Sequence, residues 1–269
     1  MSDPFWVFVF TALLSVGGWW LGARCGRWGR PWDWVIVGVT LGLLVGWAVL
    51  QRRPEWGLQV LPVWVLSRVE GVGGVPMFAV MCGVAWTRCK GLRERRLVGC
   101  AAVFAAVYLL HGGLWMLQPA SSWALAETVQ GQDTRQSTDW SCVPAASAHA
   151  LTMLGHPVSE AVMAERTAAR PGVGSTVLRA VDGLRAELAG TRYGVELLYL
   201  DVEELRRAPM PALTPLRLEA TQQHMVTLLR VTERGVLLDD PEFGRTYYTA
   251  EEFAGVYDGR VIVFVPRVD

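Results

Sequence analysis

Apolar residues are concentrated in the first half of the chain, where they form long runs separated by short polar stretches. A helix that crosses a membrane needs about 20 mostly apolar residues, because the hydrocarbon layer is about 30 Å thick. Two of the runs reach this length, and two are slightly shorter. The pattern therefore predicts about four transmembrane helices, at residues 5–23, 34–50, 71–86 and 97–117.

Basic residues in the connecting loops predict the orientation of these helices, because cytoplasmic loops are enriched in Arg and Lys. They follow the first and third apolar runs, between Arg24 and Arg30 and between Arg88 and Arg96. This bias places both chain termini outside the cytoplasm. We therefore expect a multi-pass protein of a bacterial inner or cell membrane with an extracytoplasmic C-terminal domain. A fifth span at residues 58–66 would reverse the orientation.

The second half of the chain has the pattern of a mixed domain. Residues 1–117 are interpreted as a transmembrane domain, residues 118–135 as a polar linker and residues 136–269 as the mixed domain. Apolar residues with a 3.6-residue period predict helices at 142–154, 159–168 and 175–187. Short β-rich runs then predict strands at 195–200, 212–217, 224–231, 235–239, 245–249 and 260–265. Helices followed by an antiparallel sheet define an α+β domain.

Charge and cysteine content narrow the chemistry. The 25 basic and 25 acidic residues cancel, so no nucleic-acid partner is expected. Four of the five cysteines lie in or beside apolar runs, where a cysteine usually serves as a small packing residue. Only Cys142 lies in the polar half. A single cysteine with a distant histidine is a candidate nucleophile.

The predicted elements place three residues where they could act together with Cys142. Cys142 begins a predicted helix, whose exposed N–H groups favour the thiolate that a cysteine nucleophile requires. His224 begins one predicted strand and Asp240 follows the next, so a hairpin would make them neighbours. The Asp240 carboxylate could then orient the His224 imidazole as the base for Cys142. Gln136 could donate to the oxyanion beside the Cys142 N–H.

Other residues compete for these roles. His149 lies two helical turns after Cys142, too far along the helix to act on it directly, and His156 follows the helix end. Asp239 competes with Asp240, but strand alternation sends the two side chains to opposite faces. Gln132 is the alternative to Gln136.

The polar half resembles the bacteriocin-processing, double-glycine-leader cysteine peptidases. The matching pieces are Gln136-Ser-Thr-Asp-Trp-Ser-Cys142 with the following Val-Pro-Ala-Ala, His224-Met-Val-Thr-Leu-Leu, Asp240-Pro241, Gly244, Phe253 and Gly259-Arg-Val-Ile-Val-Phe. The sequence departs from the family at Val143, where a glycine is usual, and contains no phosphate-binding Gly-x-x-x-x-Gly-Lys motif of an exporter ATPase.

The resemblance implies a papain-like fold and cleavage of a peptide bond through a thioester, without metal or cofactor. It implies that Cys142 is the nucleophile, His224 the general base and acid, and Asp240 the residue that orients it. It also places Gln136 in the oxyanion hole. The family's exporter-fused members face the cytoplasm, whereas the charge bias of this chain places its domain outside.

The sequence therefore predicts a membrane-bound cysteine peptidase. We expect a peptide or protein substrate, such as a leader or precursor peptide, and contact with a lipid bilayer. A secretion system or exporter is a candidate partner. One alternative is a transglutaminase-like acyl transferase that uses the same triad. The other is a non-catalytic peptide-binding module of a secretion complex.

Overall fold

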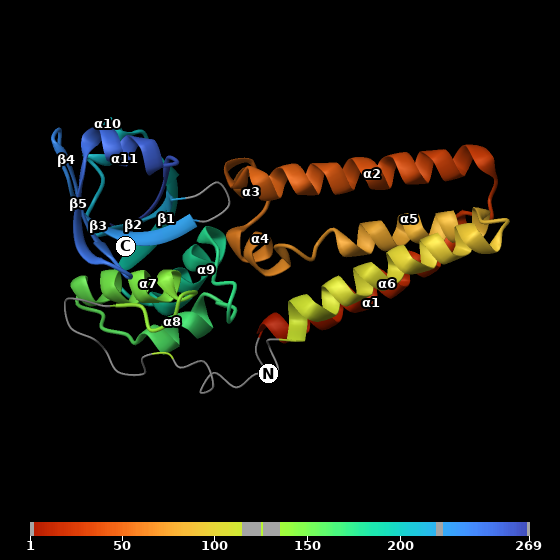
Figure 1. Cartoon of the computed structure of the whole chain (residues 1–269), viewed down its shortest axis with the longest axis horizontal. Helices are drawn as coiled ribbons and strands as arrows, with labels where there is room; N and C mark the ends of the chain where they lie inside the picture. The colour runs from red at the N-terminus through yellow and green to blue at the C-terminus, as the bar shows by residue number, and fades with distance from the viewer. Residues whose placement is uncertain (1–2, 115–124, 126–134, 219–222, 268–269) are drawn as a thin grey trace. The chain divides into compact units, whose positions relative to one another are not determined.

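The computed structural model describes residues 3–114, 125, 135–218 and 223–267. The chain forms two compact units, Met1–Gln118 and Pro119–Asp269 (Figure 1). Most of the predicted linker, residues 118–135, lies outside the described residues.

The described part of the first unit consists of helices joined by short turns. Its helices are α1 (Asp3–Cys25), α2 (Arg30–Arg52), α3 (Pro54–Val60), α4 (Val63–Val69), α5 (Val75–Arg88) and α6 (Leu92–Leu114). Glycines allow α1 and α5 to pack closely. A Cβ atom at Gly22 would lie 2.1 Å from the Val80 carbonyl oxygen, and one at Gly83 would lie 2.2 Å from that of Trp19. Small residues at a contact of this kind let two helix backbones approach each other.

The expectation of about four membrane spans is wrong for the described residues. Two helices there are long and apolar enough to cross a membrane, Phe5–Cys25 and Pro31–Arg52. The third apolar run forms α5, which has only 14 residues. The fourth forms α6, whose described part opens with the charged residues 93–96. Two such helices near an N-terminus indicate membrane association only weakly.

The short apolar stretch at residues 58–66 does not form a span either. Pro62 divides it between α3 and α4, each of seven residues, because proline cannot continue a helix from the preceding residues. The orientation predicted from the loop charges depended on four spans. The multi-pass topology and the extracytoplasmic position of the second unit are therefore not supported.

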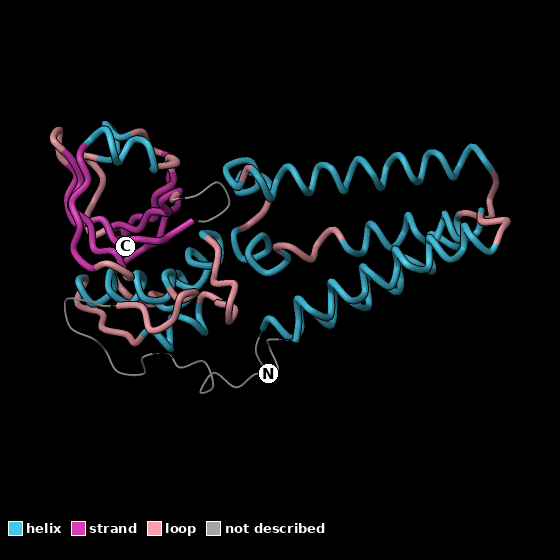
Figure 2. The backbone as a smooth tube through the Cα atoms, in the orientation of Figure 1, coloured by secondary structure: helices cyan, strands magenta, loops and turns pink. Residues whose placement is uncertain are grey.

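The second unit consists of helices followed by an antiparallel sheet, which confirms the predicted α+β order. Its helices are α7 (Cys142–Met153), α8 (Glu160–Arg166), α9 (Val177–Glu187), α10 (Val202–Leu205) and α11 (Ala250–Val256). Its strands are β1 (Tyr193–Tyr199), β2 (Ala212–Arg217), β3 (Gln223–Val231), β4 (Gly235–Asp240), β5 (Gly244–Thr249) and β6 (Arg260–Pro266), in the order β1-β6-β2-β3-β4-β5. Figure 2 shows α7–α9 on one side of this curved sheet and α10 and α11 on the other.

Side chains on the two faces of the sheet have different roles. On one face, Val226 and Leu238 belong to a buried cluster that includes Phe253 of α11. On the other face, the Thr227 hydroxyl donates a hydrogen bond to the Ala146 carbonyl of α7 at 3.1 Å. Because strand residues alternate between faces, β3 and β4 hold a core on one side and α7 on the other.

The contact between α8 and α9 depends on Gly183. This residue is buried in α9, and a Cβ atom there would lie 2.6 Å from the Arg166 carbonyl oxygen of α8. We expect Gly183→Ala to lower the free energy of unfolding of the second unit by about 2 kcal/mol, because backbone atoms must move apart. Guanidinium unfolding of the full chain, followed by hydrogen exchange in α8 and α9, measures the change.

Gly255→Ala is the matched control. Gly255 also lies in a helix, α11, but a Cβ atom there would have no heavy atom within 4 Å. The higher helix propensity of alanine should stabilise this variant by up to about 1 kcal/mol. Equal effects of the two substitutions would contradict the proposed close contact at Gly183.

Candidate active site

Cys142 is the first residue of α7, and it is half-buried. The preceding Ser141 occupies the N-cap position, but its side chain makes no capping bond. Its hydroxyl instead donates to the Thr138 carbonyl at 3.0 Å. The first N–H groups of a helix have no partner within it, so the start of α7 can stabilise a negative charge near Cys142.

His224 and Asp240 form a buried pair where β3 begins and β4 ends. Only 5% of His224 and 3% of Asp240 is exposed. Nε2 of His224 lies 2.7 Å from Oδ1 of Asp240. The same oxygen accepts the backbone N–H groups of Glu242 at 2.7 Å and Phe243 at 3.2 Å. The backbone N–H groups of the turn after Pro241 therefore fix the Asp240 carboxylate, and this carboxylate in turn orients the His224 imidazole.

Cys142 is the second partner of the His224 ring. Burial alone lowers the pKa of His224, but hydrogen bonds to Asp240 and Cys142, together with their negative charges, raise it to about 10. Because Nε2 faces Asp240, Nδ1 is the nitrogen left for Cys142. Burial raises the pKa of Asp240, yet hydrogen bonds from His224 and the Glu242 N–H lower it overall. The raised pKa of His224 and the lowered pKa of Asp240 favour the charged forms of both groups beside Cys142.

Gln136 is held beside the same turn. Its backbone N–H donates to the carbonyl of Pro241, the residue after Asp240, at 2.8 Å. The side chain is half-buried, and its Oε1 atom is buried without a hydrogen-bond partner among the described residues. The start of α7 and the β3–β4 hairpin therefore bring Cys142, His224 and Asp240 together. The backbone of Gln136 lies beside Pro241, next to this group.

The competing residues lie elsewhere. Nε2 of His149 is 2.8 Å from Oδ2 of Asp239, on the face of the sheet that packs against α7. His156 pairs with Glu187 at 3.2 Å. Gln132 lies outside the described residues. Neighbouring aspartates of β4 thus pair with different histidines, as strand alternation requires.

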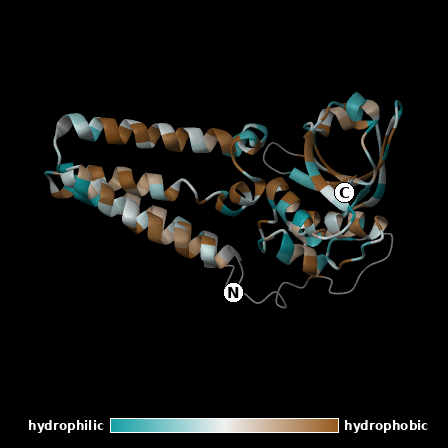
Figure 3. Ribbon diagram, turned by 180° about the vertical axis from the view of Figure 1, so that it is seen from behind, coloured by the Kyte–Doolittle hydropathy of each residue, from teal (hydrophilic) through white to brown (hydrophobic). Residues whose placement is uncertain are grey.

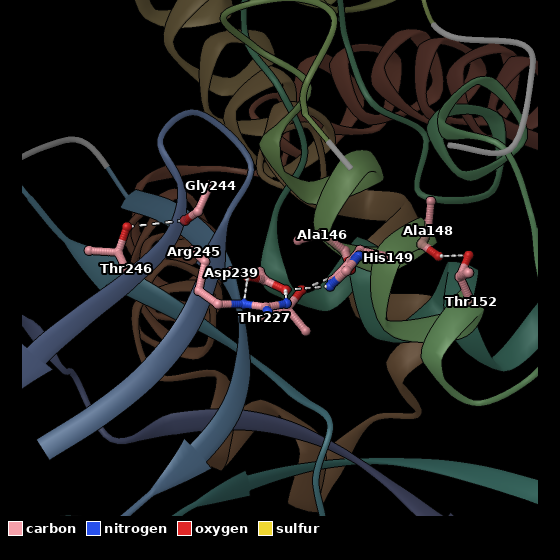
Figure 4. A network of polar contacts seen from close by, with 9 residues as sticks. All are labelled: Ala146, Ala148, His149, Thr152, Thr227, Asp239, Gly244, Arg245 and Thr246. Carbon is pink, nitrogen blue, oxygen red and sulfur yellow. Dashed lines mark hydrogen bonds and ion pairs between the residues drawn. The ribbon is translucent and has the colours of Figure 1, made fainter. Parts of the chain in front are cut away.

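The pair of His149 and Asp239 is part of a network that was not predicted from the sequence (Figure 4). The Arg245 guanidinium donates to both oxygens of Asp239, at 3.0 and 3.2 Å. With the bond from Thr227 to Ala146, the network joins the middle of α7 to β3, β4 and β5. Two features of the sequence could have indicated this network. They are the histidine inside a mostly apolar helix and the two adjacent aspartates at a strand end. Their pairing depended on the fold.

An α+β domain with a cysteine at a helix start beside a buried His–Asp pair has the arrangement of cysteine peptidases. Residues 133–269, about half of the chain, match the family model of the Peptidase C39 family. The chain belongs to this family, which confirms the resemblance to double-glycine peptidases at the level of the family.

Known relatives resemble this chain over a similar length. An uncharacterized protein of Methanothermobacter marburgensis is 31% identical over 131 residues, which are 48% of this chain and 84% of that protein. A double glycine motif protease from an AMS/PCAT transporter, solved with its leader peptide, is 20% identical with a TM-score of 0.42, covering 53% of this chain and 94% of that one. The peptidase domain of Streptococcus ComA, a bifunctional ABC transporter, is 18% identical with a TM-score of 0.42, covering 54% and 99%.

Proposed function

We propose that this chain is a cysteine peptidase that cleaves a leader or precursor peptide, with Cys142 as nucleophile. The observation that carries the proposal is the His224 ring, which is buried between the Asp240 carboxylate at 2.7 Å and Cys142. A histidine held in this way keeps a cysteine ready as thiolate and has a proton to give. Membership of the Peptidase C39 family supports the same activity.

The proposed reaction has two halves. The Cys142 sulfur attacks the carbonyl carbon of the peptide bond, and the Cys142 N–H and the Gln136 side-chain amide stabilise the oxyanion. The His224 imidazolium then gives its proton to the departing amine, which leaves a thioester on Cys142. Neutral His224 next takes a proton from water, whose oxygen attacks the thioester carbon. The carbon–sulfur bond then breaks, which releases the carboxylic acid and regenerates the Cys142 thiolate beside the His224 imidazolium. Asp240 keeps the ring in one orientation throughout.

We further propose that the first unit anchors the enzyme to a membrane, and that an exporter or secretion system is its partner. Large apolar side chains of α2 are exposed, including Trp34, Val39 and Leu43, of which 76%, 58% and 58% is accessible. Figure 3 shows the same hydrophobic character along the helix. Exposed apolar surface of this extent requires a lipid or protein partner. A tethered peptidase would meet substrates that are membrane-bound or in transit.

Incubation of the full chain with a peptide pool tests the proposal. The protein, in detergent micelles, receives peptides with and without a Gly-Gly pair, together with a primary amine, and mass spectrometry identifies the products. We expect new carboxyl ends that the Cys142→Ala variant does not produce. Amine-capped ends would show the transglutaminase-like alternative. Binding without any change in the peptides would show the non-catalytic one.

A further inference from the structure

The segment between Gln136 and Cys142 carries both proposed donors to the oxyanion. Its first residue is held by the hydrogen bond from the Gln136 N–H to the Pro241 carbonyl. Its last turn is closed by Ser141, whose hydroxyl donates to the Thr138 carbonyl at 3.0 Å and accepts the Thr138 N–H at 3.2 Å. Ser137, between these two contacts, is held from outside the segment.

The group that holds Ser137 is Glu160, the first residue of α8. Oε1 of Glu160 accepts the Ser137 N–H at 3.0 Å, and Oε2 accepts the Ser137 hydroxyl at 2.5 Å. Only 2% of Glu160 is exposed. Both oxygens of a buried carboxylate are thus directed at one serine, the residue that follows Gln136.

A carboxylate is costly to bury unless hydrogen bonds replace those that water would make. Here the replacement comes from neutral groups of Ser137, which ties the Ser137 backbone and side chain to a fixed point on α8. The Gln136 amide needs such an anchor, because its Oε1 makes no hydrogen bond to the described residues. The backbone on either side therefore helps to determine where that amide lies.

We infer that Glu160 is a positioning residue. Through its hydrogen bonds to Ser137, it fixes the position of the Gln136 amide relative to Cys142. The inference rests on the proposed peptidase function and adds to it a residue outside the triad. Oxyanion donors act only when they lie at the position where charge develops. Loss of Glu160 should therefore impair the attack on a peptide carbonyl and leave the nucleophile itself competent.

The test compares Glu160→Ala, Glu160→Gln and Ser137→Ala with the full-length wild type. Cleavage gives kcat and KM for a peptide that the wild type cuts, and iodoacetamide gives the alkylation rate of Cys142, which needs no oxyanion hole. We expect Glu160→Ala to lower kcat about 10- to 100-fold, with KM and the alkylation rate changed less than about threefold. Glu160→Gln should restore most of kcat, because an amide can accept the Ser137 N–H and donate to its hydroxyl. Ser137→Ala, which keeps the N–H contact, should fall between.

Glu187→Ala is the matched control, since it removes another largely buried carboxylate of the domain, one bonded to Arg166 and His156. It should leave kcat within about threefold of the wild type. The inference would be overturned if Glu160→Ala lost cleavage and Cys142 alkylation in parallel. It would also be overturned if kcat fell equally in Glu160→Ala and Glu187→Ala. Either result would leave Glu160 with a general structural role. If Glu160→Ala does not fold, Ser137→Ala and Glu160→Gln decide by the same comparison.

Hydrogen exchange separates failure of this inference from failure of the proposed function. Faster exchange of residues 136–141 in Glu160→Ala, with α7 still protected, is expected whether or not the wild type cleaves a peptide. Unchanged exchange there would overturn the anchoring role. If residues 136–141 exchange faster in Glu160→Ala than in the wild type, but the wild type cleaves no peptide, the peptidase function is rejected and the anchoring role of Glu160 is retained.

Discussion

Cys142→Ala is expected to reduce peptide cleavage by at least about 10⁴-fold, because it removes the sulfur on which the thioester forms. The helix start around Cys142 and the His224 imidazolium beside it favour the thiolate. In the wild type, we expect iodoacetamide to modify Cys142 at least about tenfold faster than an ordinary exposed thiol. Cleavage kinetics and mass mapping of the alkylated residue measure both effects.

Cys100→Ala is the control for this experiment. Cys100 is the exposed cysteine of α6, and its loss should leave the cleavage rate unchanged. Cleavage by the Cys142→Ala variant at the wild-type rate would reject Cys142 as nucleophile. Alkylation of Cys142 no faster than of Cys100 would reject the activated thiolate.

Asp240→Asn is expected to lower the cleavage rate about 100-fold, in the range of a general acid–base contribution. The substitution removes the negative charge that helps to raise the pKa of His224 to about 10. The pKa should fall, so that the imidazolium is lost at a lower pH. The alkaline limb of the pH profile should move down with it. NMR titration of the His224 ring and the pH dependence of cleavage provide the measurements.

Asp239→Asn is the matched control, because the adjacent aspartate bonds to His149 and Arg245. We expect it to destabilise the contact of α7 with the sheet while the His224 titration stays near that of the wild type. A similar fall in the pKa of His224 in both variants would contradict the separate roles of the two aspartates.

The same pair contributes to the pH dependence of stability. The pKa of His224 is raised above its ordinary value of 6.5, so its contribution is complete below about pH 6.5 and disappears as the pH rises through about 10. The pKa of Asp240 is lowered from 3.8, so its contribution is present above that value and disappears as the pH falls through the lowered pKa. Asp240→Asn should remove the acid-side dependence and weaken the alkaline-side one, because Cys142 still helps to raise the pKa of His224.

Much of the second unit could be predicted because its signals are local. The 3.6-residue period of apolar residues predicted a helix from Cys142, and α7 ends within one residue of the expected position. Alternating β-rich runs predicted the strands that form β3 and β4. The hairpin then brought His224 next to Asp240, as the order of the elements required.

The predictions for the first unit were less accurate, since apolar character alone does not distinguish a span from a shorter helix. Composition predicted four apolar runs, but proline and charged residues determined where the helices begin and end. Pro62 separated α3 from α4, and α5 remained at 14 residues. Counting spans from hydropathy therefore overestimated their number in the described residues.

The sequence by itself determined the division into an apolar and a polar half, the order of helices and strands, and the residues able to act as nucleophile, base and carboxylate. These properties depend on residue types and on spacings within one element. The tertiary structure places Asp240 beside His224, as the hairpin predicted. Only the tertiary structure decided that Asp239 pairs with His149. It also decided that Pro241 and Glu160 hold the segment before Cys142. Such contacts join residues far apart in the chain, and their free energy becomes available only after the sheet and helices have packed.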